Sequence, residues 1–294
     1  MNDGHLTVCI TRPLQPVHNL VQRVASAPNP PGVAVRCFGR FEMTVADQAV
    51  NWSGIRPRVR TLMRYLALHA GHPVHREDII AALWPELPGR AGVNNLQVGV
   101  STLRTFIEPG VARGASRLIP RDGESYQLAI GEGCHSDVVS FDAAVATARR
   151  AHTAGRIDAA VTALTEALAL VAGDLLPEDG PAEWVINERT RYRFKAAEAA
   201  ATLARLELDS GRPHRAIRAA QRTLELDVFH DAGWRTLISA QERVGDAAAA
   251  GRSRQQYRGV LRSLGVAGAI GGGLGGVSGG HGRLNSSTSA RAVS

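Results

Sequence analysis

The chain of 294 residues has few cysteines, few aromatic residues and a single lysine, Lys195. Its 3 cysteines, Cys9, Cys37 and Cys134, lie far apart and form no CxxC pair, which argues against a disulfide framework and against a zinc site. Aromatic residues make up 5% of the chain, while alanine and aliphatic residues are abundant. This balance favours helix-rich structure over a β-sandwich.

Several functional signatures are also missing. No run approaches about 18 apolar residues and no signal peptide opens the chain, so we expect no membrane span and a cytoplasmic protein. Neither GxxxxGK[ST] nor GxSxG is present, and the adjacent His135, Ser136 and Asp137 do not make a catalytic triad. A GxGxxG match at 271–276 lies in Gly- and Ser-rich sequence. We therefore predict no enzyme, no catalytic residue, no cofactor and no metal.

The formal net charge of +7 is unevenly distributed. Residues 33–130 carry 12 arginines against 8 acidic residues, a net of +4, whereas residues 131–265 carry 18 basic and 18 acidic residues. A basic excess on one compact segment is typical of a protein with a polyanionic partner. It is equally compatible with an ordinary surface, so charge alone leaves both interpretations open.

The chain divides into four parts. Residues 1–32 are rich in Pro, Asn and Ser towards their end and are predicted to be a flexible leader. Residues 266–294 are Gly- and Ser-rich and are predicted to be a disordered tail. Between them we expect a first domain at 33–130 and a second, all-helical domain at 137–265.

The first domain begins with alternating apolar residues at 33–50, which predicts a small antiparallel sheet of two or three strands. Helical spacing follows at 59–70, 76–84 and 91–107. Asp122-Gly123, between two extended apolar stretches, predicts a β-hairpin at 118–128. Strands, three helices and a hairpin in this order indicate a winged helix-turn-helix.

The second domain contains an internal repeat. Gly211 and Gly245 are 34 residues apart, each begins a similar pattern, and Gly155 begins a third copy. The alternative is an unrelated Ala-rich bundle. The spacing of 56 between Gly155 and Gly211 indicates a 22-residue insertion or a long helix. The predicted fold is mainly α with a small β component: a winged helix-turn-helix followed by an all-α tetratricopeptide-like domain.

The third helix of the first domain is the predicted recognition helix. With Leu96, Val100, Leu103 and Ile107 turned to the core, its polar side faces outward. Asn and Gln can pair with an adenine edge, Ser and Thr can reach bases or phosphates, and a valine can pack against a thymine methyl group. The base-reading candidates are Asn94, Asn95, Gln97, Val98, Ser101 and Thr102. The alternatives are a solvated polar face, or asparagines that cap a helix that begins later.

Arginines at two places on this domain could contact phosphates, which position a protein without reading sequence. One group opens the first helix, and the other lies near the hairpin. The candidates for contacts with the DNA backbone or for the wing are Arg56, Arg58, Arg60, Arg104, Arg117 and Arg121. In the second domain, the acidic residues Asp174, Glu178, Asp179 and Glu183 are expected to be solvated surface charge.

Three segments resemble the OmpR-type winged helix of the SARP family of bacterial transcriptional activators: GIRPRVRTL at 54–62, VHREDIIAALW at 74–84 and NNLQVGVSTLR at 94–104. The downstream helices resemble that family's bacterial transcriptional activator domain. The resemblance covers about residues 33–265. It implies binding to direct repeats of double-stranded DNA near promoters, self-association on DNA and contact with RNA polymerase. The chain departs from the family pattern at Gly99, usually a bulky residue, and at Thr102, usually a basic one.

A second hypothesis remains open. Helical repeats offer surfaces for peptides and partner proteins, so the chain could be a tetratricopeptide-type interaction adaptor whose DNA-binding domain is weakened. Retention on specific DNA favours the regulator, whereas a stable protein partner without DNA retention favours the adaptor.

Overall fold

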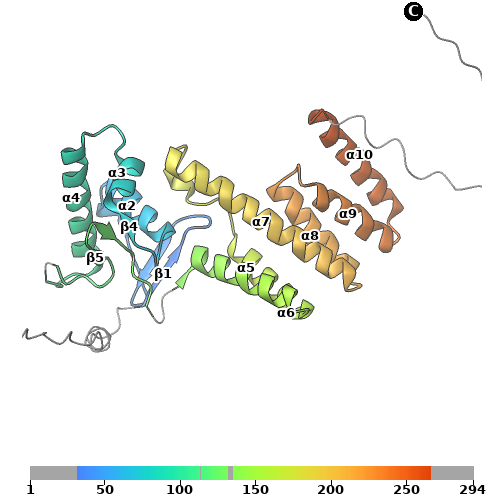
Figure 1. Cartoon of the computed structure of the whole chain (residues 1–294), viewed down its shortest axis with the longest axis horizontal. Helices are drawn as coiled ribbons and strands as arrows, with labels where there is room; N and C mark the ends of the chain where they lie inside the picture. Colours follow the sequence, from blue (N-terminus) through green and yellow to red (C-terminus); the bar gives the residue numbers. More distant parts are fainter. Residues whose placement is uncertain (1–31, 113, 132–134, 266–294) are drawn as a thin grey trace, which may run out of the picture.

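The computed structural model describes residues 32–112, 114–131 and 135–265. Almost all of the predicted leader and the whole predicted tail lie outside these ranges. Within them the molecule has two parts, a small α/β domain followed by helices arranged in pairs (Figure 1). The long helix α7 runs from the first part into the second. The predicted fold class is confirmed.

The first domain has two small sheets and three α-helices. One sheet has the strand order β3-β2-β1-β7, with β1 antiparallel to β2 and parallel to β7; the other has the order β4-β6-β5. The elements are β1 (Val33–Arg36), β2 (Glu42–Val45), β3 (Gln48–Ala49), η1 (Trp52–Gly54), α2 (Pro57–Leu68), β4 (Val74–His75), α3 (Arg76–Leu83), α4 (Gly89–Ile107), β5 (Arg121–Asp122), β6 (Ser125–Tyr126) and β7 (His135–Ser136).

Local sequence explains where the helices begin and end. Pro57 occupies the first position of α2, where its missing N–H costs nothing. The ring of His75 caps α3 by accepting a hydrogen bond from the Glu77 amide, and Pro85 follows the end of that helix. The predicted hairpin is confirmed as β5 and β6, with Gly123 at a φ of +55° in the turn. We call the hairpin Arg121–Tyr126 the wing.

The second domain consists of three helix pairs, which confirms the repeat. Gly155, Gly211 and Gly245 have φ values of +70°, +72° and +79°, and each closes the turn inside a pair. The helices are α5 (Asp137–Thr153), α6 (Ile157–Leu170), η2 (Pro177–Asp179), α7 (Glu183–Asp209), α8 (Pro213–Leu226), α9 (Asp231–Arg243) and α10 (Ala247–Ser263). The long spacing between the first two glycines has two causes: α7 is 27 residues long, and an irregular segment, 171–182, precedes it.

The two domains share one hydrophobic core. Phe38 of the first domain makes edge contacts with Phe141 of α5 and Tyr192 of α7, with ring centroids 5.8 and 5.6 Å apart. The carboxylate of Asp137 accepts hydrogen bonds from the backbone amides of Cys37 and Phe38. Ser136 and Asp137 thus have structural roles, since Ser136 caps α5.

The expectation of solvated acidic residues ahead of α7 is wrong for one of the four, Asp179, whereas Glu178 is exposed although it accepts a hydrogen bond. Asp179 has 3% of its side chain exposed and accepts two hydrogen bonds from Arg64 of α2. Glu178 accepts a hydrogen bond of 2.8 Å from the Phe41 amide. Both acidic groups hold segment 171–182 against the first domain, a tertiary role that local composition does not reveal. Asp174 and Glu183 are exposed, as expected.

Candidate nucleic-acid interface

Helix α4 lies tightly against α2 and α3. The predicted inward stripe of Leu96, Val100, Leu103 and Ile107 is buried. A Cβ atom added at Gly92 would lie 2.6 Å from Cγ2 of Ile80, and one added at Gly99 would lie 2.9 Å from Cδ2 of Leu62. These glycines therefore permit close packing. Gly99 belongs to the buried side of α4, so its lack of a side chain does not alter the outward surface.

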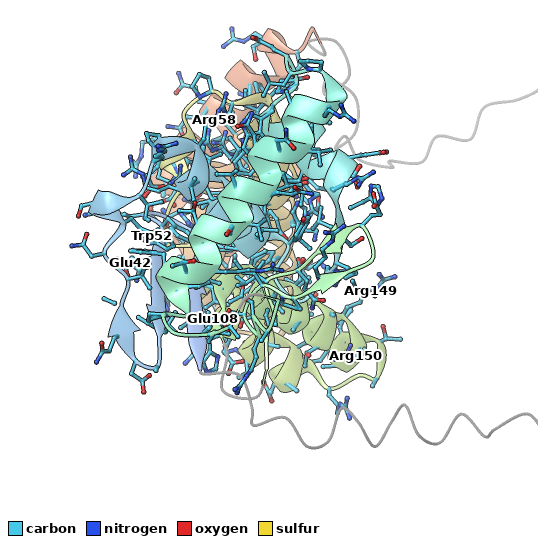
Figure 2. All side chains as sticks on the ribbon, turned by 90° about the vertical axis from the view of Figure 1, so that its left-hand side faces the viewer. Glu42, Trp52, Arg58, Glu108, Arg149 and Arg150 are labelled. Atoms are coloured by element: carbon cyan, nitrogen blue, oxygen red, sulfur yellow. The ribbon has the colours of Figure 1, made fainter. Side chains whose placement is uncertain are left out.

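The opposite side of α4 carries the predicted base-reading candidates. Five of them are exposed and Thr102 is half-buried; the exposed ones are Asn94, Asn95, Gln97, Val98 and Ser101. Because α4 begins at Gly89, Asn94 and Asn95 lie inside the helix and do not cap it. Figure 2 looks directly onto this side of α4.

One flank of α4 is formed by the segment that leads into α2. A shallow hollow of about 540 Å³ is lined by Ile55, Val98, Ser101, Thr102, Thr105 and Phe106. Arg56 and Arg58, at the start of α2, are exposed, whereas Arg60 is half-buried. Trp52 and Arg58 lie on the same side of α4 in Figure 2. Sequence reasoning missed Ile55, which lies in an irregular segment without a periodic signal.

The wing forms the other flank. A larger groove of about 710 Å³ separates it from α4, and Gln97, Ser101, Arg104 and Arg121 are among the residues that line it. Nε and Nη2 of Arg104 donate hydrogen bonds of 2.9 and 2.6 Å to the carbonyl oxygen of Ile119. The guanidinium of Arg104 therefore connects α4 to the irregular segment that leads into the wing.

The charge on the wing is partly compensated. Arg121 donates a hydrogen bond of 2.7 Å to the carbonyl oxygen of Gly123, and its guanidinium lies 5.7 Å from the centre of the Tyr126 ring. The carboxylate of Glu124 forms an ion pair with Arg76 and lies 4.0 Å from Arg121. The positive charge that Arg121 brings to the tip is thus balanced at short range by an acidic neighbour.

Glu108 fixes the loop between α4 and the wing, a role that sequence reasoning did not detect. Its side chain is buried and accepts hydrogen bonds from the backbone amides of Arg117 and Leu118 and from the hydroxyl of Ser116. Three donors satisfy the hydrogen-bonding capacity of this buried carboxylate. In the sequence, only the following Pro109-Gly110 indicates that Glu108 lies at the end of a helix. Arg117 itself is exposed beside this loop.

Two findings bear on other kinds of site. Among the residues that the structure describes, no group of three or more His, Cys, Asp or Glu side chains could hold a metal ion. Within the same ranges, every helix is too short or too polar to cross a membrane.

An exposed polar helix between two arginine-bearing flanks, joined to paired helices, defines a two-domain transcriptional regulator. Residues 54–128 match the model for "Transcriptional regulatory protein, C terminal", and residues 136–268 match that for "Bacterial transcriptional activator domain". This pair of domains supports a SARP-type bacterial transcriptional activator. Both matched families are regulators of transcription and not enzymes.

Solved structures agree with this fold. The structure of Mycobacterium tuberculosis EmbR in complex with a low-affinity phosphopeptide matches with a TM-score of 0.66 and 22% sequence identity, over 80% of this chain and 61% of that chain. The chain thus spans about three fifths of the length of EmbR. A MamA protein structure matches with a TM-score of 0.21 and 14% identity, over 44% of this chain and 84% of that one. This TM-score is too low to indicate a shared fold. None of the curated proteins matches the chain.

Proposed function

We propose that the protein binds specific double-stranded DNA with α4 in the major groove and the wing at the adjacent minor groove. The observation that carries this proposal is the exposed outward side of α4, bordered by Arg56 and Arg58 on one flank and by Arg104 and Arg121 on the other. A helix fits the major groove of B-DNA, and phosphates border that groove on both sides. Basic groups on both flanks of one helix match this arrangement.

Each candidate has a role in this proposal. Asn94, Asn95 and Gln97 read base edges through their amides. A side-chain amide can donate to N7 of an adenine and at the same time accept from the amino group of that adenine. Val98, Ser101 and Thr102 contact the neighbouring bases. Arg56, Arg58, Arg60 and Arg117 contact phosphates, which fix the register of the helix without reading sequence. Arg104 positions the wing through Ile119, and Arg121 lies at its tip.

The resemblance of the two domains to SARP-type activators extends the proposal to the site and the partner. We propose that two copies bind side by side on direct repeats near promoters, in the cytoplasm, and activate transcription by contact with RNA polymerase. The helical domain supports a protein contact, because it exposes large apolar side chains on α7 and in the α8–α9 loop. These are Ile186, Phe194, Val228 and Phe229. Exposed apolar groups of this size commonly mark interaction surfaces.

The test is an affinity comparison between a preferred duplex, selected from random sequences, and a scrambled duplex. Asn95→Ala should cost ~1–3 kcal/mol on the preferred duplex and little on the scrambled one. Asn187→Ala removes an exposed asparagine on α7 and should leave both affinities unchanged. Equal losses on both duplexes for the α4 variant would show that Asn95 does not read a base.

The adaptor hypothesis is tested in parallel. Phe194→Ala should reduce capture of RNA polymerase by the protein without changing its affinity for DNA, since Phe194 lies on the helical domain. Absence of retention on any DNA at low salt, together with a stable partner other than polymerase, would replace the regulator with an adaptor.

A further inference from the structure

Two threonine hydroxyl groups in the middle of α4 are not free to donate outward. Oγ1 of Thr102 donates a hydrogen bond of 2.8 Å to the carbonyl oxygen of Val98, and Oγ1 of Thr105 donates one of 3.1 Å to that of Ser101. A hydroxyl has one proton. These two threonines therefore offer an outside partner their methyl groups and oxygen lone pairs.

The same stretch of α4 exposes an aliphatic side chain. Val98 is 61% exposed, although it lies in the centre of the outward side between Asn94 and Thr102. It lines the shallow hollow together with Ile55, Ser101, Thr102, Thr105 and Phe106. This hollow, which we call the Val98 hollow, thus combines two aliphatic side chains, an aromatic one, a serine and two threonines whose hydroxyl protons are donated within α4.

The two flanks of α4 consequently differ in chemistry. The groove on the wing side is lined by groups that can hydrogen-bond, among them Gln97, Arg104 and Arg121. The Val98 hollow on the other side is lined mainly by carbon. The edges of the four base pairs carry one apolar group in the major groove, the C5 methyl of thymine; the other groups are hydrogen-bond donors and acceptors.

We propose that the Val98 hollow receives the C5 methyl group of a thymine, so that Val98 determines specificity through apolar contact and not through a hydrogen bond. This inference rests on the proposed function and adds to it the class of base read at one position. Each copy of the protein then requires thymine at one base pair beneath the centre of α4, on the side of Ile55. The amides of Asn94, Asn95 and Gln97 read other positions.

Deoxyuridine provides the test, because it lacks only the C5 methyl group of thymidine and pairs identically. Each thymine of the preferred duplex is replaced in turn, and the affinity of the full chain is measured by titration. At one position per bound copy, the substitution should weaken binding about fourfold, the expected effect of burying one methyl group. The other uridine substitutions should have little effect.

Variants assign the effect to the hollow. Val98→Ala should bind the thymine and uridine duplexes at that position equally, while its affinity for scrambled DNA is unchanged. Leu264→Ala, which truncates an exposed leucine after α10 in the helical domain, should retain the fourfold difference. Because the side chains of Val98 and Leu264 are 61% and 51% exposed, neither substitution should unfold the protein.

The outcomes separate this inference from the proposed function. Specific binding that tolerates uridine at every position would overturn thymine-methyl recognition and leave the regulator intact. Uridine sensitivity that persists in Val98→Ala would also overturn it. If the wild-type protein prefers no duplex at all, both the inference and the proposed function fail.

Discussion

The guanidinium of Arg64 on α2 forms two hydrogen bonds with the carboxylate of Asp179 ahead of α7, from Nε and from Nη2, each 2.6 Å long. The two side chains are 11% and 3% exposed. Arg189 of α7 adds a hydrogen bond of 2.7 Å to the carbonyl oxygen of Leu175 in the same segment. The helix that supports α4 is therefore joined directly to the helical domain, and the two domains are held in one relative orientation.

Arg64→Ala should destabilise the protein by ~3–5 kcal/mol, because it leaves the carboxylate of Asp179 buried without its cationic partner. The double variant Arg64→Met/Asp179→Leu should be less destabilised than this single variant, since it removes both charges. Denaturant unfolding of the three proteins measures the free energies.

The exposed pair of Arg193 and Asp174 is the matched control. Its side chains are 55% and 68% exposed, so Arg193→Ala should cost only ~0–1 kcal/mol. A loss of this small size in Arg64→Ala would mean that the inter-domain pair is not buried in solution.

Two glycine substitutions should have opposite effects. Gly92→Ala places a Cβ atom 2.6 Å from Cγ2 of Ile80, and such overpacking typically costs ~1–3 kcal/mol. Gly251→Ala on α10 meets no atom within 4 Å and should stabilise the protein by about 1 kcal/mol through helix propensity. Thermal unfolding of both variants checks the sign. Equal stabilisation would show that α4 is not packed closely on α3.

Local signals made part of the fold predictable. Gly155, Gly211 and Gly245 mark turns that each depend on a single residue with positive φ, and Asp122-Gly123 marks the wing in the same way. The strands β4 and β7 were not predicted, because two residues are too few to show alternation. Their partners β6 and β1 are distant in sequence, so only the folded chain brings them together.

Cys37 should make stability fall at alkaline pH. Burial, together with the negative charges of Asp137 and Glu178, raises the pKa of its thiol well above the ordinary value. The unfolded chain can ionise this thiol above about pH 8.5, whereas the folded protein cannot. The free energy of unfolding should therefore decrease as the pH rises beyond that value.

The measurement uses a variant with serine at Cys9 and Cys134, unfolded by denaturant between pH 7 and 9.5. Adding Cys37→Ala should remove part of the alkaline slope. A thiol reagent should label Cys37 only after unfolding. Rapid labelling of the folded protein at neutral pH would contradict the buried, protonated thiol.

Arg58 should contribute to DNA affinity through charge alone. Arg58→Ala should weaken binding to preferred and scrambled duplexes similarly and reduce the slope of log affinity against log salt by about 1, because one phosphate contact is lost. Arg252→Ala on α10 is the control, since it removes an exposed arginine on the last described helix, far from α4 (Figure 1). An unchanged slope in Arg58→Ala would remove this residue from the interface.

The candidate site was predictable to a similar degree. The buried stripe of α4 fixes which side chains face outward, so the exposure of Asn94 and Val98 follows from helical periodicity. Periodicity does not reveal that Thr102 donates to its own helix or that Arg104 donates to Ile119. Nor does it reveal Glu108, because each of these partners depends on rotamers and on tertiary neighbours.

The most direct test of the central claim, that α4 and its flanks recognise specific DNA, is capture of genomic DNA by the purified full chain at two salt concentrations. Recognition predicts that a few promoters sharing a motif, repeated about one helical turn apart, remain enriched at the higher salt. Weak retention without sequence preference that disappears at the higher salt would contradict it, because only a generally basic surface would then remain.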